Sequence, residues 1–255
     1  MNDPVSLLLP PAMRALRFNR TFVTADGARR RIREASVRPD AYGPPRSLRR
    51  DVRVEVAHDR GWPVYTLTPV AGRPAGAVVY AHGGGWVNEI VHQQWRMAAD
   101  VAAGAGVAVV VPIYPLVPWG TAGPVRDRVV EIVGRTAQRY GPTGVLGDSA
   151  GGQIVLSAAL RLRDDGVELP ATVLVSPALD LTWSNPRIPA VQPSDPWLAT
   201  PGGVVLAQAW AGDLPLTDPA VSPLFGDPTG LGPLTVFTGT RDVLNPDVHL
   251  LVEKA

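Results

Sequence analysis

The sequence contains no cysteine, and this absence excludes two classes of site. Without thiols the chain can form neither a disulfide framework nor a zinc site built from cysteine ligands. Lysine is nearly absent too, because Lys254 is the only one and arginine supplies the other positive charges. The formal net charge of +1 gives no electrostatic reason to expect binding to nucleic acid. We therefore expect no nucleic acid among the partners.

Long apolar runs are absent as well. No stretch is long enough to cross a bilayer without interruption, so we expect no stable membrane insertion. Residues 1–5 lack the basic and apolar regions that open a secretory signal, which predicts a cytoplasmic location. The sequence has no phosphate-binding loop, nucleotide fingerprint or cluster of metal-ligand residues. It therefore predicts no metal and no cofactor.

What the sequence does contain is an alternation of short apolar runs and helical stretches. The chain of 255 residues is long enough for one large α/β domain. Predicted strands cover residues 52–56, 62–68, 77–80, 107–111, 144–146, 171–175 and 234–238, and predicted helices cover 91–103, 122–140 and 153–162. This order is typical of a mostly parallel sheet flanked by helices. Residues 177–220 are rich in proline and tryptophan with weak periodicity, which predicts an insertion above the sheet.

The strongest motif is the run 147–152, which reads Gly-Asp-Ser-Ala-Gly-Gly. It fits Gly-x-Ser-x-Gly, the sharp strand-to-helix turn that lifts a serine hydroxyl above a sheet. Such a turn needs small residues at Gly147 and Gly151 because its backbone is crowded, and it makes Ser149 a candidate nucleophile. The alternative is a glycine-rich turn without chemistry. The predicted strand before it and the predicted helix after it favour the catalytic interpretation.

A second glycine motif, His-Gly-Gly-Gly-Trp at 82–86, follows another predicted strand. Glycines let backbone N–H groups approach a ligand closely, as an oxyanion hole requires. The alternative is a tight connection that needs positive φ angles. We expect His82 to order this loop rather than to act as a base, and Trp86 to pack the loop down.

Two further short runs, together with these two motifs, indicate a resemblance to a known protein family. Residues 114–118 read Tyr-Pro-Leu-Val-Pro and residues 239–244 read Gly-Thr-Arg-Asp-Val-Leu. Together with 82–86 and 147–152, they make the chain resemble the hormone-sensitive-lipase-like family of α/β-hydrolase carboxylesterases. The resemblance covers the sequence from about residue 50 to the end, and it implies an α/β-hydrolase fold.

The resemblance also implies a role for particular residues. Ser149 would be the nucleophile and Asp242 the acid of a catalytic triad. The backbone N–H groups of Gly84, Gly85 and Ala150 would form the oxyanion hole. The N-terminal segment 1–45 and the insertion 177–220 would build a small helical cap over the core, which would span residues 46–255.

The chain departs from the family pattern at the catalytic histidine. In the family a histidine follows the acid after one further helix and strand, but after Asp242 only residues 243–255 remain. His82 lies in the glycine loop, and none of the three other histidines is well placed: His58, His92 and His249. We therefore expect the catalytic histidine, with a last strand and helix, to lie beyond the chain end. The core would then be incomplete at its C-terminus.

Several other side chains have two interpretations. Asp247 is a second candidate for the triad acid, and Asp148 is expected to start a helix without joining the triad. Surface positions are expected for Asp180 and Asp195. Three tryptophans of the insertion would line an acyl or alcohol pocket or simply pack the cap: Trp183, Trp197 and Trp210.

The predicted function is that of a serine carboxylesterase or lipase that cleaves small to medium acyl esters through an acyl-enzyme intermediate. Its partner would be a small-molecule ester, and a homodimer is compatible with the sequence. Cleavage of amides or formamides is an alternative, since the motifs also resemble arylformamidases. A different class of function is a non-catalytic small-molecule-binding protein on the same scaffold. A gene product without function is the third alternative.

Overall fold

The computed structural model describes residues 19–255, which form a seven-stranded sheet flanked by helices. In chain order the strands are β1 (Val52–Asp59), β2 (Trp62–Pro69), β3 (Ala77–Ala81), β4 (Ala108–Pro112), β5 (Thr143–Asp148), β6 (Thr172–Val175) and β7 (Leu234–Phe237). Their spatial order is β1-β2-β4-β3-β5-β6-β7. β2 is antiparallel to β1 and β4, and the pairs from β4 to β7 are parallel. The predicted mostly parallel sheet is confirmed.

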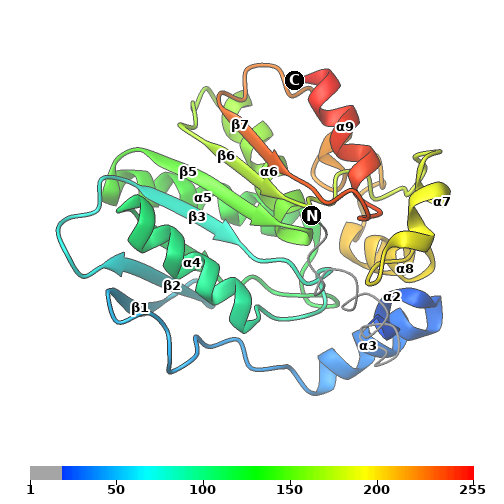
Figure 1. Ribbon diagram of the computed structural model, residues 1–255, viewed down its shortest axis with the longest axis horizontal. Helices are drawn as coiled ribbons and strands as arrows, with labels where there is room; N and C mark the ends of the chain where they lie inside the picture. Colours follow the sequence, from blue (N-terminus) through cyan, green and yellow to red (C-terminus); the bar gives the residue numbers. More distant parts are fainter. Residues whose placement is uncertain (1–18) are drawn as a thin grey trace, which may run out of the picture.

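The central strands are apolar on both faces because helices cover both. All five residues of β4, Ala-Val-Val-Val-Pro, are buried, as is usual for a strand in the middle of a parallel sheet. Tyr80 and Leu146 pack with α4 (His92–Ala105) on one face. Val79 and Val145 pack on the other face with α5 (Ala122–Tyr140) and α6 (Ala150–Asp164). Figure 1 shows these two layers of helices.

A further group of helices lies at the carboxyl ends of the strands (Figure 1). It comprises α2 (Arg20–Val23), α3 (Ala25–Val37), α7 (Ile188–Val191), the short 3₁₀ helix η1 (Gln192–Ser194) and α8 (Thr200–Ala211). α2 and α3 pack against α8, and a Cβ at Gly202 would lie 2.5 Å from the carbonyl oxygen of Phe22. The N-terminal and 177–220 segments therefore meet over the sheet. Residues 1–18 of the expected segment 1–45 lie outside the described residues.

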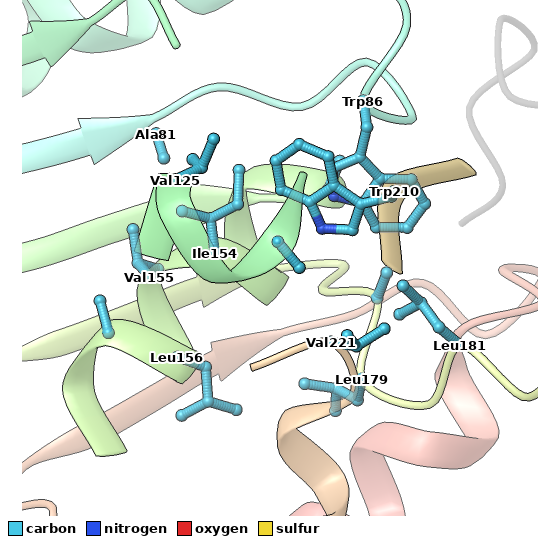
Figure 2. Close-up of a cluster of buried hydrophobic side chains, with 14 of the residues drawn as sticks. Ala81, Trp86, Val125, Ile154, Val155, Leu156, Leu179, Leu181, Trp210 and Val221 are labelled. Atoms are coloured by element: carbon cyan, nitrogen blue, oxygen red, sulfur yellow. The ribbon is translucent and has the colours of Figure 1, made fainter. Parts of the chain in front are cut away.

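The insertion is anchored by the main core. Leu179, Leu181 and Val221 belong to the same buried cluster as Ile154 and Leu156 of α6. Figure 2 shows Leu179, Leu181 and Val221 below the rings of Trp86 and Trp210, with Ile154 and Leu156 of α6 to their left. The segment is thus held by apolar burial, although its sequence has little periodicity.

The remaining elements lie near the last strand. After the 3₁₀ helix η2 (Pro223–Phe225) and β7, the chain ends in α9 (Asn245–Lys254). Among residues 19–255 no strand pairs with the outer side of β7, and the ring of Phe237 is 58% exposed. In the same range, no helix is both long and apolar enough to cross a membrane.

Candidate active site

Ser149 occupies the sharp turn between β5 and α6. Its backbone angles are φ 50° and ψ −116°, a conformation that residues with a side chain rarely adopt. Its N–H donates to the carbonyl of Val175 at 2.9 Å, and its own carbonyl accepts from Ala178 N at 3.1 Å. The turn is therefore fixed to the end of β6, and its strain of about 1–3 kcal/mol is offset by the surrounding structure.

The glycines around Ser149 are required by close backbone contacts. A Cβ at Gly151 would lie 2.0 Å from the carbonyl oxygen of Ala81, and one at Gly147 would lie 2.3 Å from that of Gly151. The prediction that both positions need small residues is confirmed. These contacts bring the first turn of α6 directly against the end of β3, where the glycine loop begins.

The loop 82–86 places backbone amides at a cavity that lies at the carboxyl end of the sheet and that Ser149 also lines. Gly84 and Gly85 have φ angles of 144° and 61°, and both line the cavity together with Ser149. Within residues 19–255, the N–H groups of Gly84, Gly85 and Ala150 donate to no protein acceptor. Ala150 is the first residue of α6, where N–H groups have no partner inside the helix and favour a negative charge. The N–H groups of Gly84 and Gly85 thus lie at the cavity without a partner in the described chain, and that of Ala150 follows Ser149 directly.

Asp148, the residue before Ser149, orders the glycine loop. One carboxylate oxygen accepts from Tyr80 Oη at 2.6 Å and from Gly83 N at 2.8 Å, and the other accepts from Gln94 Nε2 at 2.7 Å. These bonds use the Gly83 amide and leave the next two amides unpaired. Asp148 was expected only to start a helix; its role in the loop depends on partners 54 to 68 positions away, for which the sequence shows no local signal.

Gln153, in α6, connects that helix to the glycine loop and to α8. Its Oε1 accepts from the indole N–H groups of Trp86 at 3.2 Å and Trp210 at 2.8 Å, and its Nε2 donates to Ala220 O at 2.7 Å. The two indoles stack with centroids 5.9 Å apart, as Figure 2 shows. Trp86 thus packs the loop down as expected, and Trp210 belongs to the core.

His82 also orders the loop. Its Nδ1 lies 2.8 Å from Gly83 O, its ring stacks on Tyr114 with centroids 4.6 Å apart, and its carbonyl accepts from Tyr114 Oη at 2.6 Å. Burial lowers the pKa of His82, which favours a neutral ring. The prediction that His82 orders the loop is confirmed.

Asp242 lies in the loop after β7 and lines the same cavity as Ser149 and Ser176. Its Oδ1 accepts from Leu244 N at 2.9 Å, and its carboxyl group also bonds with Ser176. Burial raises the pKa of Asp242, and the charge of Asp195 raises it further, while the two hydrogen bonds oppose both effects. The cavity, of about 1430 Å³, thus brings together the two side chains that the sequence predicted for catalysis.

Two aspartates expected on the surface are buried, so that prediction was wrong. Asp180 and Asp195 are each 8% exposed. Asp195 accepts from the backbone amides of Trp197 and Leu198, and its other oxygen accepts from Val243 N at 2.9 Å. It therefore ties the insertion to the loop that carries Asp242. The sequence showed no signal for this, because the contact joins residues 48 positions apart.

The other candidates lie away from this cavity. Asp247 is buried in α9, where it accepts from Asn185 Nδ2 at 2.7 Å. Three histidines are exposed on the surface: His58, His92 and His249. Among residues 19–255 no histidine lines the cavity, and no group of three or more His, Cys, Asp or Glu side chains is placed to hold a metal ion. Of the three tryptophans in the insertion, Trp197 lines the cavity.

The sequence and the fold are both similar to those of known proteins. A family model described as the α/β-hydrolase fold matches residues 78–255. A solved esterase of the bacterial hormone-sensitive lipase family shares 28% identity and a TM-score of 0.80, with 100% of this chain and 85% of that chain covered. The chain belongs to the hormone-sensitive-lipase-like family of α/β-hydrolases.

Relatives of this α/β-hydrolase include named hydrolases. A triacylglycerol lipase of Mycobacterium tuberculosis is 36% identical over 201 residues, which span 76% of this chain and 41% of the lipase. An esterase of Acinetobacter venetianus is 29% identical over 185 residues, which span 70% of this chain and 60% of the esterase. The chain thus spans less than two thirds of the length of these two relatives.

Proposed function

We propose that this chain carries the nucleophile, the triad acid and the oxyanion hole of a serine carboxylesterase acting on small to medium acyl esters. The observation that carries the proposal is Ser149 in a strained turn beside three unpaired amides, those of Gly84, Gly85 and Ala150. A negative charge that develops on a carbonyl oxygen there would meet donors already in position. The esterase and lipase relatives support the same reaction class.

In this mechanism Ser149 Oγ attacks the ester carbonyl carbon while a general base takes its proton. The tetrahedral oxyanion is stabilised by the amides, and its collapse expels the alcohol, which receives that proton. Water then attacks the acyl-enzyme by the same route and releases the acid. Asp242 would orient the base and stabilise its protonated form, which requires an ionised carboxyl group. Activity should therefore fall as the pH drops through the raised pKa of Asp242.

The base itself is proposed to be a histidine C-terminal to Ala255 in the full protein. One observation supports this: no histidine lines the cavity in the part of the chain described. The division into a core at 46–255 and a cap from 1–45 and 177–220 belongs to the same proposal. The cytoplasmic location and the homodimer stay predictions.

The experiment is hydrolysis of p-nitrophenyl butyrate by the chain and by Ser149→Ala, each with and without added imidazole. Imidazole can supply the base, and the variant in the same buffer measures the reaction of imidazole with the ester alone. We expect turnover above that of the variant, increased by imidazole. Equal rates for the two proteins in every buffer would contradict an esterase and favour the non-catalytic binding protein.

A further inference from the structure

One carboxyl group in the cavity has no protein partner. Glu89 follows the glycine loop, and its Oε2 atom is buried without a hydrogen-bond partner among residues 19–255. The preceding residue, Asn88, folds back onto the loop, since its backbone N and its Nδ2 both donate to Gly84 O at 3.0 Å. Asn88 is therefore fixed to the loop, and Glu89, the next residue, lines the same cavity as Gly84, Gly85 and Ser149.

The arginine whose charge acts on Glu89 is bound elsewhere. Arg31, from α3, donates from Nε to Asn88 Oδ1 at 2.7 Å and from Nη2 to Asp40 Oδ2. An unpaired buried acceptor costs about 1–3 kcal/mol, and more when it is charged. A donor on a bound ligand would relieve this cost.

The cavity as a whole also favours a cation. Among the lining residues within 19–255, carboxylates outnumber arginines: Glu34, Asp40, Glu89, Asp148, Asp195 and Asp242 against Arg20, Arg30, Arg31 and Arg241. A lysine is not among them. An ammonium group entering this cavity would therefore meet an excess of negative charge.

We propose that Glu89 is a specificity-determining residue that binds a primary ammonium group on the ester, at a position remote from the reacting carbonyl. The inference rests on the proposed function for the identity of the ligand as an ester. A primary ammonium fits better than a quaternary one, because the unpaired oxygen requires a hydrogen-bond donor and only the primary group provides one. Charge-assisted bonds of this kind are short and strong.

The test measures binding, so that it does not depend on turnover. Ser149→Ala protein is titrated by calorimetry with butyrate esters of ω-amino alcohols of several chain lengths. Each is paired with the alkyl ester that has a methyl group in place of the ammonium. We expect at least one amino ester to bind about tenfold more tightly than its alkyl partner. Adding Glu89→Gln should abolish this preference, while adding Glu34→Gln, which removes the same charge from another lining residue, should leave it largely intact.

A pH series on Ser149→Ala protein adds a test that does not need the Glu89 variant. Burial, and then the charge of Asp40, raise the pKa of Glu89 to about 7, and Arg31 opposes them. The neighbouring phenol of Tyr114 has a pKa raised well above its usual value, so it stays neutral in this range. Alkyl ammonium groups stay charged up to a pKa of about 10. The preference for the amino ester should therefore increase as the pH rises through about 7.

Two results would overturn the inference: a preference that Glu89→Gln leaves unchanged, or equal binding of both members of every pair at all pH values. Failure of the proposed function is recognised separately. In that case no ester is hydrolysed even with imidazole, although the ammonium preference in binding persists.

Discussion

The two sides of the proposed catalytic site are built differently. One side, called the elbow side here, is the turn 147–151 around Ser149. Its residues Gly147, Ala150 and Gly151 are buried, and Asp148 accepts hydrogen bonds from β3, the glycine loop and α4. On the acid side, residues 239–241 are exposed, and Asp242 is held by one backbone amide and Ser176. The elbow side is thus part of the core, whereas the acid side is a loop at the edge of the sheet.

The difference indicates which residues serve both folding and the proposed reaction, and which serve mainly the reaction. Positions on the elbow side cannot change without disturbing the packing of β3 against α6, so catalytic preorganisation there is inseparable from folding. On the acid side the carboxyl group is buried against its own preference for water, as its raised pKa shows. Substitutions there should affect chemistry far more than stability.

The largest effect is expected from Gly151→Ala. The new Cβ would lie 2.0 Å from a backbone oxygen of β3, and neither backbone can yield without moving the sheet or the helix. We expect a loss of about 3 kcal/mol or more in the free energy of unfolding. Urea denaturation followed by circular dichroism measures it.

Gly134→Ala in α5 is the matched control. Nothing lies within 4 Å of a Cβ built at this helical glycine, so the variant should gain about 0.5–1 kcal/mol from helix propensity. Similar losses in both variants would show that the contact with Ala81 does not decide the cost.

A second large loss is expected from Gln153→Leu. The substitution leaves the indole N–H groups of Trp86 and Trp210 and the carbonyl of Ala220 buried without partners. With about 1 kcal/mol or more for each unsatisfied group, we expect a loss of roughly 3 kcal/mol. Gln93→Leu on the exposed side of α4 is the control and should stay within about 0.5 kcal/mol of the parent.

The comparison itself is tested by the pair Asp148→Asn and Asp242→Asn. At position 148 an amide N–H₂ would face donors, so we expect a loss of about 2 kcal/mol in stability. At position 242 the substitution removes a buried charge, so stability should not fall, whereas turnover of p-nitrophenyl butyrate should. Equal losses of stability in thermal unfolding would contradict the contrast between the two sides.

An effect confined to one pH range is expected from Asp247→Asn in α9. Burial, and then the charge of Asp180, raise the pKa of Asp247 to about 6, while the hydrogen bond from Asn185 opposes them. The folded state therefore resists ionisation of this group, so its contribution to stability is lost as the pH rises from the unfolded value, 3.8, to about 6.

The variant should match the parent below the unfolded pKa and exceed it by about 3 kcal/mol at neutral pH. Asp213→Asn, at an exposed position, controls for the loss of one negative charge. A difference between parent and Asp247→Asn that is constant across the pH range would contradict the assignment.

Much of the fold could be predicted because it depends on short local patterns in the sequence. The apolar runs at 107–111 and 144–146 and the glycines of the run 147–152 identify buried strands and a crowded turn without knowledge of distant contacts. The glycine loop 82–86 could be recognised for the same reason, because three successive glycines indicate a backbone that another group approaches closely.

The rest depends on contacts between segments far apart in the sequence. The bond from Val243 N to Asp195 ties the insertion to the loop of Asp242, and Gln153 bonds to Trp86, Trp210 and Ala220; none of these contacts has a local signature. Asp148 was named, but its partners Tyr80 and Gln94 lie 68 and 54 positions away. Polar networks of this kind follow from tertiary packing, which a single sequence does not specify.

The proposal that Ser149 and the amides of Gly84, Gly85 and Ala150 form one reactive site is tested most directly by the binding of butylboronic acid, observed by ¹¹B NMR. A boronic acid forms a tetrahedral adduct with an activated serine and places an oxygen where the oxyanion would lie, so it probes Ser149 and the amides together. In imidazole buffer, which can supply the base, we predict a tetrahedral boron signal with the parent protein that disappears in Ser149→Ala. A boron signal that stays trigonal with the parent protein, or a tetrahedral signal that persists in the variant, would contradict the account.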